Sequence, residues 1–160
     1  MRKLTTRNSN KSKEKIALAF DKLEPDVIAC QLTYLEWKTL RRVSFSDYKS
    51  YAIKGSIQDN PPLERSIQLF NGLSQWIQCM VLSKTTPKQR ADIIHKFLEV
   101  AQHLRLIQNF NSLMAVIGGI CHSALSRLSK TNLYLSVEDQ RILGDLTELL
   151  SSNCNYGQYR

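Results

Sequence analysis

The 160-residue sequence lacks a long hydrophobic run. Its longest apolar stretch, residues 113–121, is far shorter than the ~20 residues that a helix needs to cross a bilayer, and glycines interrupt it. Residues 1–15 contain no apolar segment of the kind that a secretory signal requires. We therefore expect a soluble, cytoplasmic chain without stable membrane insertion.

Motifs for metal, redox and phosphate chemistry are also lacking. The four cysteines lie far apart, and none forms the C-x-x-C pair that is typical of zinc and redox sites. Gly118 and Gly119 lack the lysine and the spacing of a P-loop, so we expect them to allow close helix packing. Cys121 and His122 are adjacent, and adjacent side chains point apart on a helix or turn. We expect no metal, no cofactor and no covalent catalyst.

The remaining titratable residues favour structural roles. His95 and His103 lie eight residues apart, which is too far for both to bind one metal ion. We interpret them as surface or boundary residues. Glu138 and Asp139 are best explained by helix capping and solvation, because no second acidic cluster faces them in the sequence.

The formal charge of +8 raises the question of a nucleic-acid partner. Residues 1–15 hold six Lys or Arg and one Glu, so most of the excess lies there. This segment is rich in Ser and Asn, which predicts a flexible basic leader before a domain at 16–160. A basic helical nucleic-acid binder stays an alternative, but no recognition motif accompanies the charge, and we expect no nucleic acid.

Apolar residues recur at three- and four-residue steps, and strand-like alternation is absent, so an all-α fold is expected. Asn60 before two prolines and Thr86 before Pro87 mark the starts of two long helices, which a very short loop should hold antiparallel. The stripe that includes Leu73, Trp76 and Met80 fits a core better than a cofactor cleft. Helices are expected at residues 27–43, within 47–59, from 61 to about 81, from 87 to about 107, at 111–121, and from Ser136, where Asp139 completes a capping box.

Several blocks resemble the catalytic domain of Ras-type guanine-nucleotide exchange factors. Residues 23–48, with their A-x-Q-L-T-x-L-E core and the Arg that follows, resemble the opening helix of that domain, and residues 60–128 resemble its centre. The run Q-N-F-N-S-L-M-A-V-I-G-G, followed by S-R-L, is the most specific element. The leader, the S-F-S-D-Y block, the paired glycines and the closing residues resemble the Ras guanyl-releasing protein (RasGRP) branch. The matching blocks cover roughly residues 16–160.

The resemblance implies an irregular multi-helix exchange-factor domain that loads a Ras-family small GTPase, Ras or Rap, with GTP. Such a factor prefers the nucleotide-free GTPase and so weakens nucleotide binding by linkage. Residue by residue, the surface that grips the GTPase's switch II falls near Arg41, Ala101, Gln108 and Asn109. Arg41 offers a multidentate donor to acidic switch residues. Ala101 is smaller than the apolar residue that relatives often carry.

Other matching positions are expected to hold the domain together, through an aromatic anchor, an N-cap and ion pairs; they are Glu64, Arg65, Phe110, Asn111 and Arg127. The family's levering hairpin and last core helices are expected after Arg160, so the resemblance implies a C-terminally incomplete domain. Recruitment of the full-length protein to membranes is expected to depend on further modules. A non-catalytic module that binds a GTPase or scaffold stays an alternative.

Overall fold

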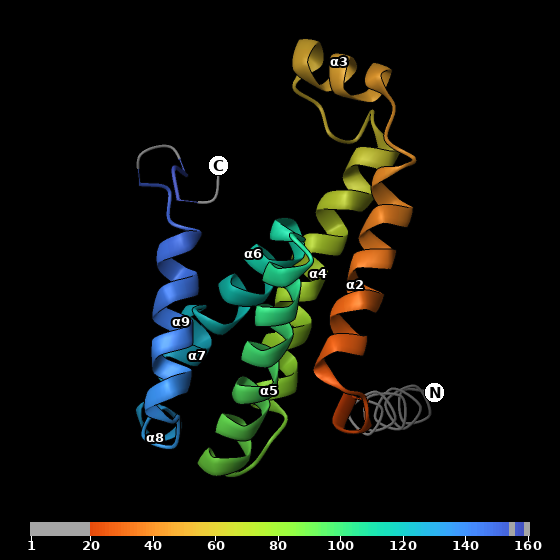
Figure 1. Cartoon of the computed structure of the whole chain (residues 1–160). Helices are drawn as coiled ribbons and strands as arrows, with labels where there is room; N and C mark the ends of the chain where they lie inside the picture. Colours follow the sequence, from red (N-terminus) through yellow and green to blue (C-terminus); the bar gives the residue numbers. More distant parts are fainter. Residues whose placement is uncertain (1–19, 154–155, 159–160) are drawn as a thin grey trace, which may run out of the picture.

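Figure 1 shows a computed structural model of the chain, which describes residues 20–153 and 156–158. All regular structure in these residues is helical, which confirms the all-α expectation. No helix among them is both long and apolar enough to span a bilayer. The expected leader and Cys154 lie outside the described part. The helices are α2 (Pro25–Leu40), α3 (Phe45–Lys54), α4 (Pro61–Leu82), α5 (Pro87–Leu106), α6 (Phe110–Ile120), α7 (Ser123–Ser126), α8 (Ser129–Asn132) and α9 (Val137–Leu149).

Capping residues start α5 and α9 where the sequence predicted. Thr86 forms a capping box with Gln89, and Ser136 forms one with Asp139. In each pair the hydroxyl oxygen accepts a hydrogen bond from a first-turn backbone N–H that has no partner within the helix. These starts depend on local side chains, so the sequence was sufficient to place them.

Other boundaries differ from the prediction. α2 begins earlier and ends earlier than expected, and Pro25 occupies its first turn. α3 begins before Asp47, because Ser44 forms a capping box with that residue. Asn60 does occupy the N-cap position of α4, but its side chain donates a hydrogen bond to the Ser56 carbonyl over 2.8 Å instead of capping. The four-residue helices α7 and α8 were not predicted, because such short segments show no helical period.

The core lies among α2, α4, α5 and α6. α4 and α5 run antiparallel, as their short connection predicted (Figure 1). The rings of Phe20, Trp76 and Phe97 pack with centroids 4.6 to 5.4 Å apart. Leu73 and Met80 of α4 are buried. The apolar stripe of α4 therefore belongs to the core, as expected, and not to a cofactor cleft.

Close contact between α4 and α6 requires a glycine. A Cβ atom added at Gly119 would lie 3.0 Å from the backbone oxygen of Ser74 and 3.2 Å from Cβ of Ile77. A Cβ at Gly118 would meet nothing within 4 Å. The expectation that the paired glycines allow close packing thus holds for Gly119 alone, since Gly118 faces open space.

These two glycines form a matched test of helix packing. Gly119→Ala should lower the free energy of unfolding by about 1–3 kcal/mol, because α4 and α6 must move apart to admit the methyl group. Gly118→Ala should raise it by about 0.5–1 kcal/mol, since alanine loses less conformational freedom in a helix. Chemical denaturation of both variants measures the difference. Equal effects at the two positions would contradict the close approach of α6 to α4.

Candidate functional site

A buried polar network joins α2 to the junction between α5 and α6. Glu36 and Ser112 are both buried, and the Ser112 hydroxyl donates a hydrogen bond to a Glu36 carboxylate oxygen. The Asn109 side-chain amide donates to Thr33 Oγ1 over 2.9 Å. The Asn109 side-chain oxygen accepts from the Ser112 N–H and so caps α6. The A-x-Q-L-T-x-L-E and Q-N-F-N-S segments, far apart in the sequence, therefore meet in space.

This network fixes which flank of α2 faces the junction. Thr33, Trp37 and Arg41 follow one another at four-residue steps, so their side chains form one row along the helix. Thr33 at one end of the row bonds to Asn109. Arg41 at the other end lies about 12 Å further along the helix axis. The row thus leads from the junction to the C-terminal end of α2.

Arg41 is exposed and held over an aromatic ring. Its guanidinium carbon lies 4.9 Å from the centroid of the Trp37 ring. The Trp37 ring in turn lies 6.2 Å from that of Tyr34, and the Lys38 amine lies 6.0 Å from Tyr34. We call Tyr34, Trp37, Lys38 and Arg41 the outer strip of α2. Sequence reasoning missed the two aromatic residues, although their spacing from Arg41 placed all three on one face.

Gln108 is also exposed, at the junction itself. Its φ of 59° is in the left-handed region, which non-glycine residues seldom adopt. Its backbone N–H bonds to the Arg105 carbonyl as α5 ends. The next residue, Asn109, is half-buried and uses its side chain within the network. Of the predicted partner-binding residues, the structure thus presents Arg41 and Gln108 to solvent, while Asn109 positions the junction between them.

Ala101 requires a correction. Its exposed fraction is 0%, and it belongs to the hydrophobic core. A side chain without exposed surface has no area to offer a partner in this conformation. Matching by sequence alone did not distinguish the side of α5 that faces the core from the side that faces solvent. The size of this residue therefore bears on packing within α5 and its neighbours.

Among the residues expected to hold the domain together, one has the expected contact and the others do not. Phe110 packs against the core, as an aromatic anchor would. Asn111 is exposed within α6 and is not its N-cap, which is Asn109. The ion pairs expected for Glu64, Arg65 and Arg127 are absent from the described residues. Glu64 accepts from Gln68, Arg127 donates to the Ser123 carbonyl, and Arg65 is exposed without a side-chain partner in that part of the chain.

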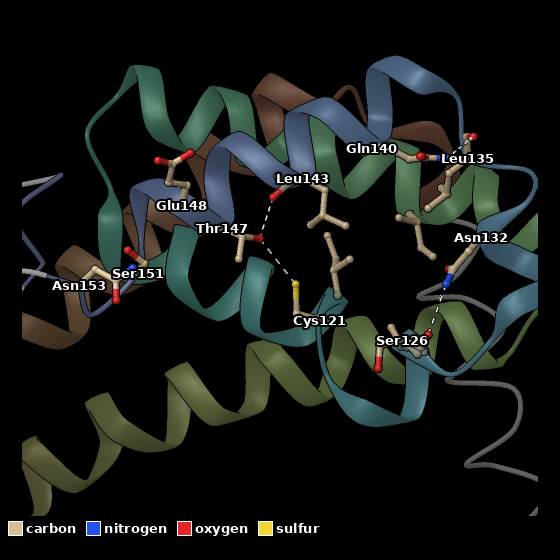
Figure 2. A pocket seen from close by; sticks show the side chains of 14 residues that line it. Cys121, Ser126, Asn132, Leu135, Gln140, Leu143, Thr147, Glu148, Ser151 and Asn153 are labelled. Atoms are coloured by element: carbon tan, nitrogen blue, oxygen red, sulfur yellow. Dashed lines mark hydrogen bonds between the residues drawn. The ribbon is translucent and has the colours of Figure 1, made fainter.

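A pocket of about 740 Å³ lies between α9 and the segment from α6 to α8 (Figure 2). Figure 2 shows Cys121 and Thr147 pointing toward each other across it, with Sγ and Oγ1 3.8 Å apart. Thr147 donates its hydroxyl proton to the Leu143 carbonyl. The ring nitrogen of His122 accepts from the Ala124 N–H instead of approaching the thiol. Cys121 and His122 thus bond to different partners. Both apolar and polar side chains line the pocket, among them Leu143, Gln140 and Glu148.

The described residues contain no group of three or more His, Cys, Asp or Glu side chains that could hold a metal ion. His95 instead pairs with Asp139, with Nδ1 and Oδ1 2.6 Å apart, and links α5 to α9. The hydrogen bond to Asp139 is the main cause of a raised His95 pKa, and Glu99 contributes to it. Burial acts to raise the pKa of Asp139, but hydrogen bonds from His95 and Ser136 outweigh it and lower that pKa. The sequence predicted a boundary histidine and a capping aspartate, but not their contact.

Loss of the Ser112 hydroxyl tests the buried network. Ser112→Ala should lower the free energy of unfolding by about 1–3 kcal/mol, because it leaves the buried Glu36 carboxyl without its donor. Glu36→Leu combined with Ser112→Ala should cost less than the sum of the single changes, since no polar group is then left unbonded. Ser129→Ala is the control, because Ser129 is exposed and its hydroxyl is unbonded within the described residues. Additive effects in the denaturation cycle would contradict the coupling.

The contact between His95 and Asp139 predicts a pH-dependent stability. The folded-state pKa of His95 is raised, so its contribution is complete below its ordinary value of 6.5 and is lost as pH rises through the raised pKa. The His95 side chain is 54% exposed, and solvent screening therefore keeps the effect below about 1 kcal/mol. At pH 6 the free energy of unfolding of the wild type should exceed that of His95→Gln by up to about 1 kcal/mol. Above pH 8 the two values should approach each other. A difference that grows with pH, or one matched by His103→Gln, would refute the assignment.

Comparison with known proteins places this geometry in a family context. The profile of the RasGEF domain matches residues 27–160. RAS guanyl-releasing protein 1 of Xenopus laevis is 56% identical over 161 residues, which cover 99% of this chain and 20% of that protein. Ras guanyl-releasing protein 3 of Homo sapiens is 54% identical over 160 residues, covering 100% of this chain and 23% of that protein. RAS guanyl-releasing protein 4 of Rattus norvegicus is 49% identical over 148 residues, with 92% and 22% covered. The chain thus spans about a fifth of the length of these relatives.

Proposed function

Because the chain belongs to the RasGEF domain family, we propose that it acts as a guanine-nucleotide exchange factor for a Ras-family small GTPase, Ras or Rap. The match over residues 27–160 is the observation that carries this proposal. The names of the similar proteins, which are guanyl-releasing proteins, agree with it. In this proposal the factor binds the switch regions of the GTPase and so promotes GDP release and GTP loading.

The outer strip of α2 is the proposed binding surface, together with Gln108. Arg41 is exposed, and its side chain makes no ion pair within the described residues, so it can meet a carboxylate of the partner. Arginine and large aromatic side chains carry much of the binding energy in protein interfaces. Stacking on Trp37 restricts the guanidinium before binding, which reduces the entropy lost on contact.

The dimensions of this surface suit one GTPase. Thr33, which bonds to the residue after Gln108, lies about 12 Å along α2 from Arg41. A standard protein interface covers about 800 Å² on each partner, which is a patch roughly 30 Å across and so exceeds this separation. One GTPase could therefore contact Arg41, Trp37 and Gln108 at once. The buried network holds the two ends of this surface at a fixed spacing.

Exchange by this route requires binding alone. A small GTPase can hold nucleotide with a free energy that approaches ~16 kcal/mol at picomolar affinity. A protein that binds the nucleotide-free form more tightly weakens nucleotide binding by the same factor. The proposed role of Arg41 and its neighbours is to supply part of that preference through contacts with the switch regions. No covalent intermediate enters the proposal.

Nucleotide release tests the function directly. The purified chain is mixed with Ras and, separately, with Rap loaded with a fluorescent guanine nucleotide, in excess unlabelled GTP. Faster release than from the GTPase alone supports exchange, and the relative rates give the preference. Full-length Ras guanyl-releasing protein 3 of Homo sapiens is the reference. Capture of nucleotide-free GTPase without accelerated release would favour the alternative, a non-catalytic GTPase-binding module, and failure of both would contradict the proposal.

Charge reversal at Arg41 tests the surface. Arg41→Glu should weaken capture of nucleotide-free GTPase, and any release rate, by at least about tenfold, because it replaces the proposed donor by a charge that repels acidic switch residues. Lys130→Glu changes the net charge equally at an exposed site on α8. Circular dichroism and thermal unfolding confirm that both variants fold. Equal capture by the two variants would exclude Arg41 from the interface.

A further inference from the structure

α3 turns its apolar face toward solvent. Phe45 and Ile53 are 83% and 72% exposed, and Tyr48 is 50% exposed. No residue of α3 is buried, and the less exposed side holds the polar residues Asp47 and Ser50. A surface helix usually directs its apolar face to the core, so α3 is inverted relative to that rule.

The exposed apolar residues of α3 form one continuous face. At roughly 100° per residue, Tyr48, Ala52, Phe45 and Ile53 fall within a single arc of the helix, and Lys49 lies within the same arc. We call these five residues the outer face of α3. In Figure 1, α3 lies at one end of the molecule, beyond the ends of α2 and α4. A flat surface could therefore reach it without touching α5, α6 or α9.

A pocket with two arginines lies between α2 and α4, close to where α3 joins them. It has a volume of about 350 Å³ and is lined by Arg42, Arg65, Thr39 and Gln68, among others. Neither guanidinium makes a hydrogen bond or an ion pair within residues 20–153 and 156–158. The nearby Glu64 carboxylate accepts from Gln68 and lies beyond ion-pair distance of both arginines. Two unneutralised guanidinium groups on one pocket are suited to a phosphate group.

Arg42 is separate from the proposed GTPase surface. It follows Arg41 by one residue, which rotates it by roughly 100° around the chain axis of α2 if the helical turn continues. Arg41 stacks on Trp37 of the outer strip, whereas Arg42 lines the pocket toward α4. The two adjacent arginines thus serve different flanks of α2.

We propose that the outer face of α3 and the pocket of Arg42 and Arg65 together dock this chain on an anionic lipid bilayer. An amphipathic helix with aromatic and aliphatic residues on one face and basic residues beside it lies in the membrane interface. Phe45 and Ile53 enter the boundary between headgroups and acyl chains, and Lys49 extends its amine toward the headgroups. Arg42 and Arg65 bind a lipid phosphate.

Charge favours a bilayer over an apolar protein surface as the occupant. The positive side chains around α3 are those of Arg42, Lys49, Lys54 and Arg65, and the acidic ones are those of Asp47, Asp59 and Glu64. Asp47 is bonded to Ser44 in the capping box, and Glu64 is bonded to Gln68. Serine and glutamine are neutral, so these carboxylates keep their charge, and the four basic side chains exceed the three acidic ones by one. The two guanidinium groups of the pocket make no ion pair within the described residues, so the positive charge beside the apolar face is concentrated there. Each basic residue near an anionic membrane surface adds to the attraction, and salt screens it.

Co-sedimentation with vesicles tests this docking. The probes are vesicles of phosphatidylcholine alone and of phosphatidylcholine with about a third phosphatidylserine, at low and high salt. The chain should bind the anionic vesicles more tightly, and high salt should weaken binding. Phe45→Ser combined with Ile53→Ser should reduce the partition coefficient by at least about tenfold, because it removes apolar area at constant charge. Arg42→Gln combined with Arg65→Gln should reduce binding to anionic vesicles but not to neutral ones.

Matched controls lie at the other end of the molecule. Leu133 and Val137 are 84% and 85% exposed, so Leu133→Ser with Val137→Ser removes comparable exposed area away from α3. Lys88→Gln with Lys130→Gln removes two exposed charges there. The basic residues 1–15 are unchanged in all variants and cannot cause a difference between them. Thermal unfolding establishes that every variant is folded.

Each outcome decides the proposal. Selective loss of vesicle binding in the α3 and arginine variants supports it. Equal binding by the α3 variant and its control, or no binding of the wild type to either vesicle, overturns it. Sedimentation velocity shows whether the wild type forms a dimer. A dimer that the α3 variant abolishes, together with a lack of vesicle binding, would overturn the proposal and show that a second copy of the chain covers this face. Exchange activity is measured without lipid, so failure here leaves the proposed GTPase function separately testable.

Discussion

The hydrogen bonds among Thr33, Glu36, Asn109 and Ser112 are the contact on which the proposed binding surface depends. They join α2 to the turn between α5 and α6 in a largely buried setting, where an unbonded polar group would be costly. Because hydrogen bonds are directional, they set the rotation of α2 as well as its position. The outer strip and Gln108 consequently occupy fixed places on one side of the domain. Apolar packing alone would tolerate more than one rotation of α2.

Two flanks of α2 carry different chemistry. One flank holds Trp37 and Arg41, in the row that begins at Thr33 beside the α5–α6 junction, and is the proposed surface for a GTPase. The other flank holds Arg42 beside α4 and leads to the inverted helix α3. If both proposals hold, one short segment of chain would bring a GTPase and a membrane surface to neighbouring sides of the same helix. Binding at either flank would then restrict how the domain approaches the other partner.

Local signals in the sequence were sufficient for the long helices, but not for the short helices α7 and α8 or for the contacts between helices. Thr86 and Ser136 marked helix starts because capping depends on a few neighbouring residues. The direction that Ala101 faces depends on which side of α5 the other helices cover, and the network depends on contacts between segments about 76 residues apart. The family resemblance covered both segments, the one with Glu36 and the one with Ser112. It could not show that these two residues bond to each other.

Hydrogen exchange with mass spectrometry tests the central claim, that the buried network presents the outer strip of α2 and Gln108 as one surface for a GTPase. Backbone amides of the chain are compared with and without an excess of nucleotide-free Ras-family GTPase. The account predicts that residues 34–41 and 105–109 gain protection together, while residues 129–140, from α8 to the first turn of α9, do not change. Protection at residues 129–140 with none in α2 would contradict it.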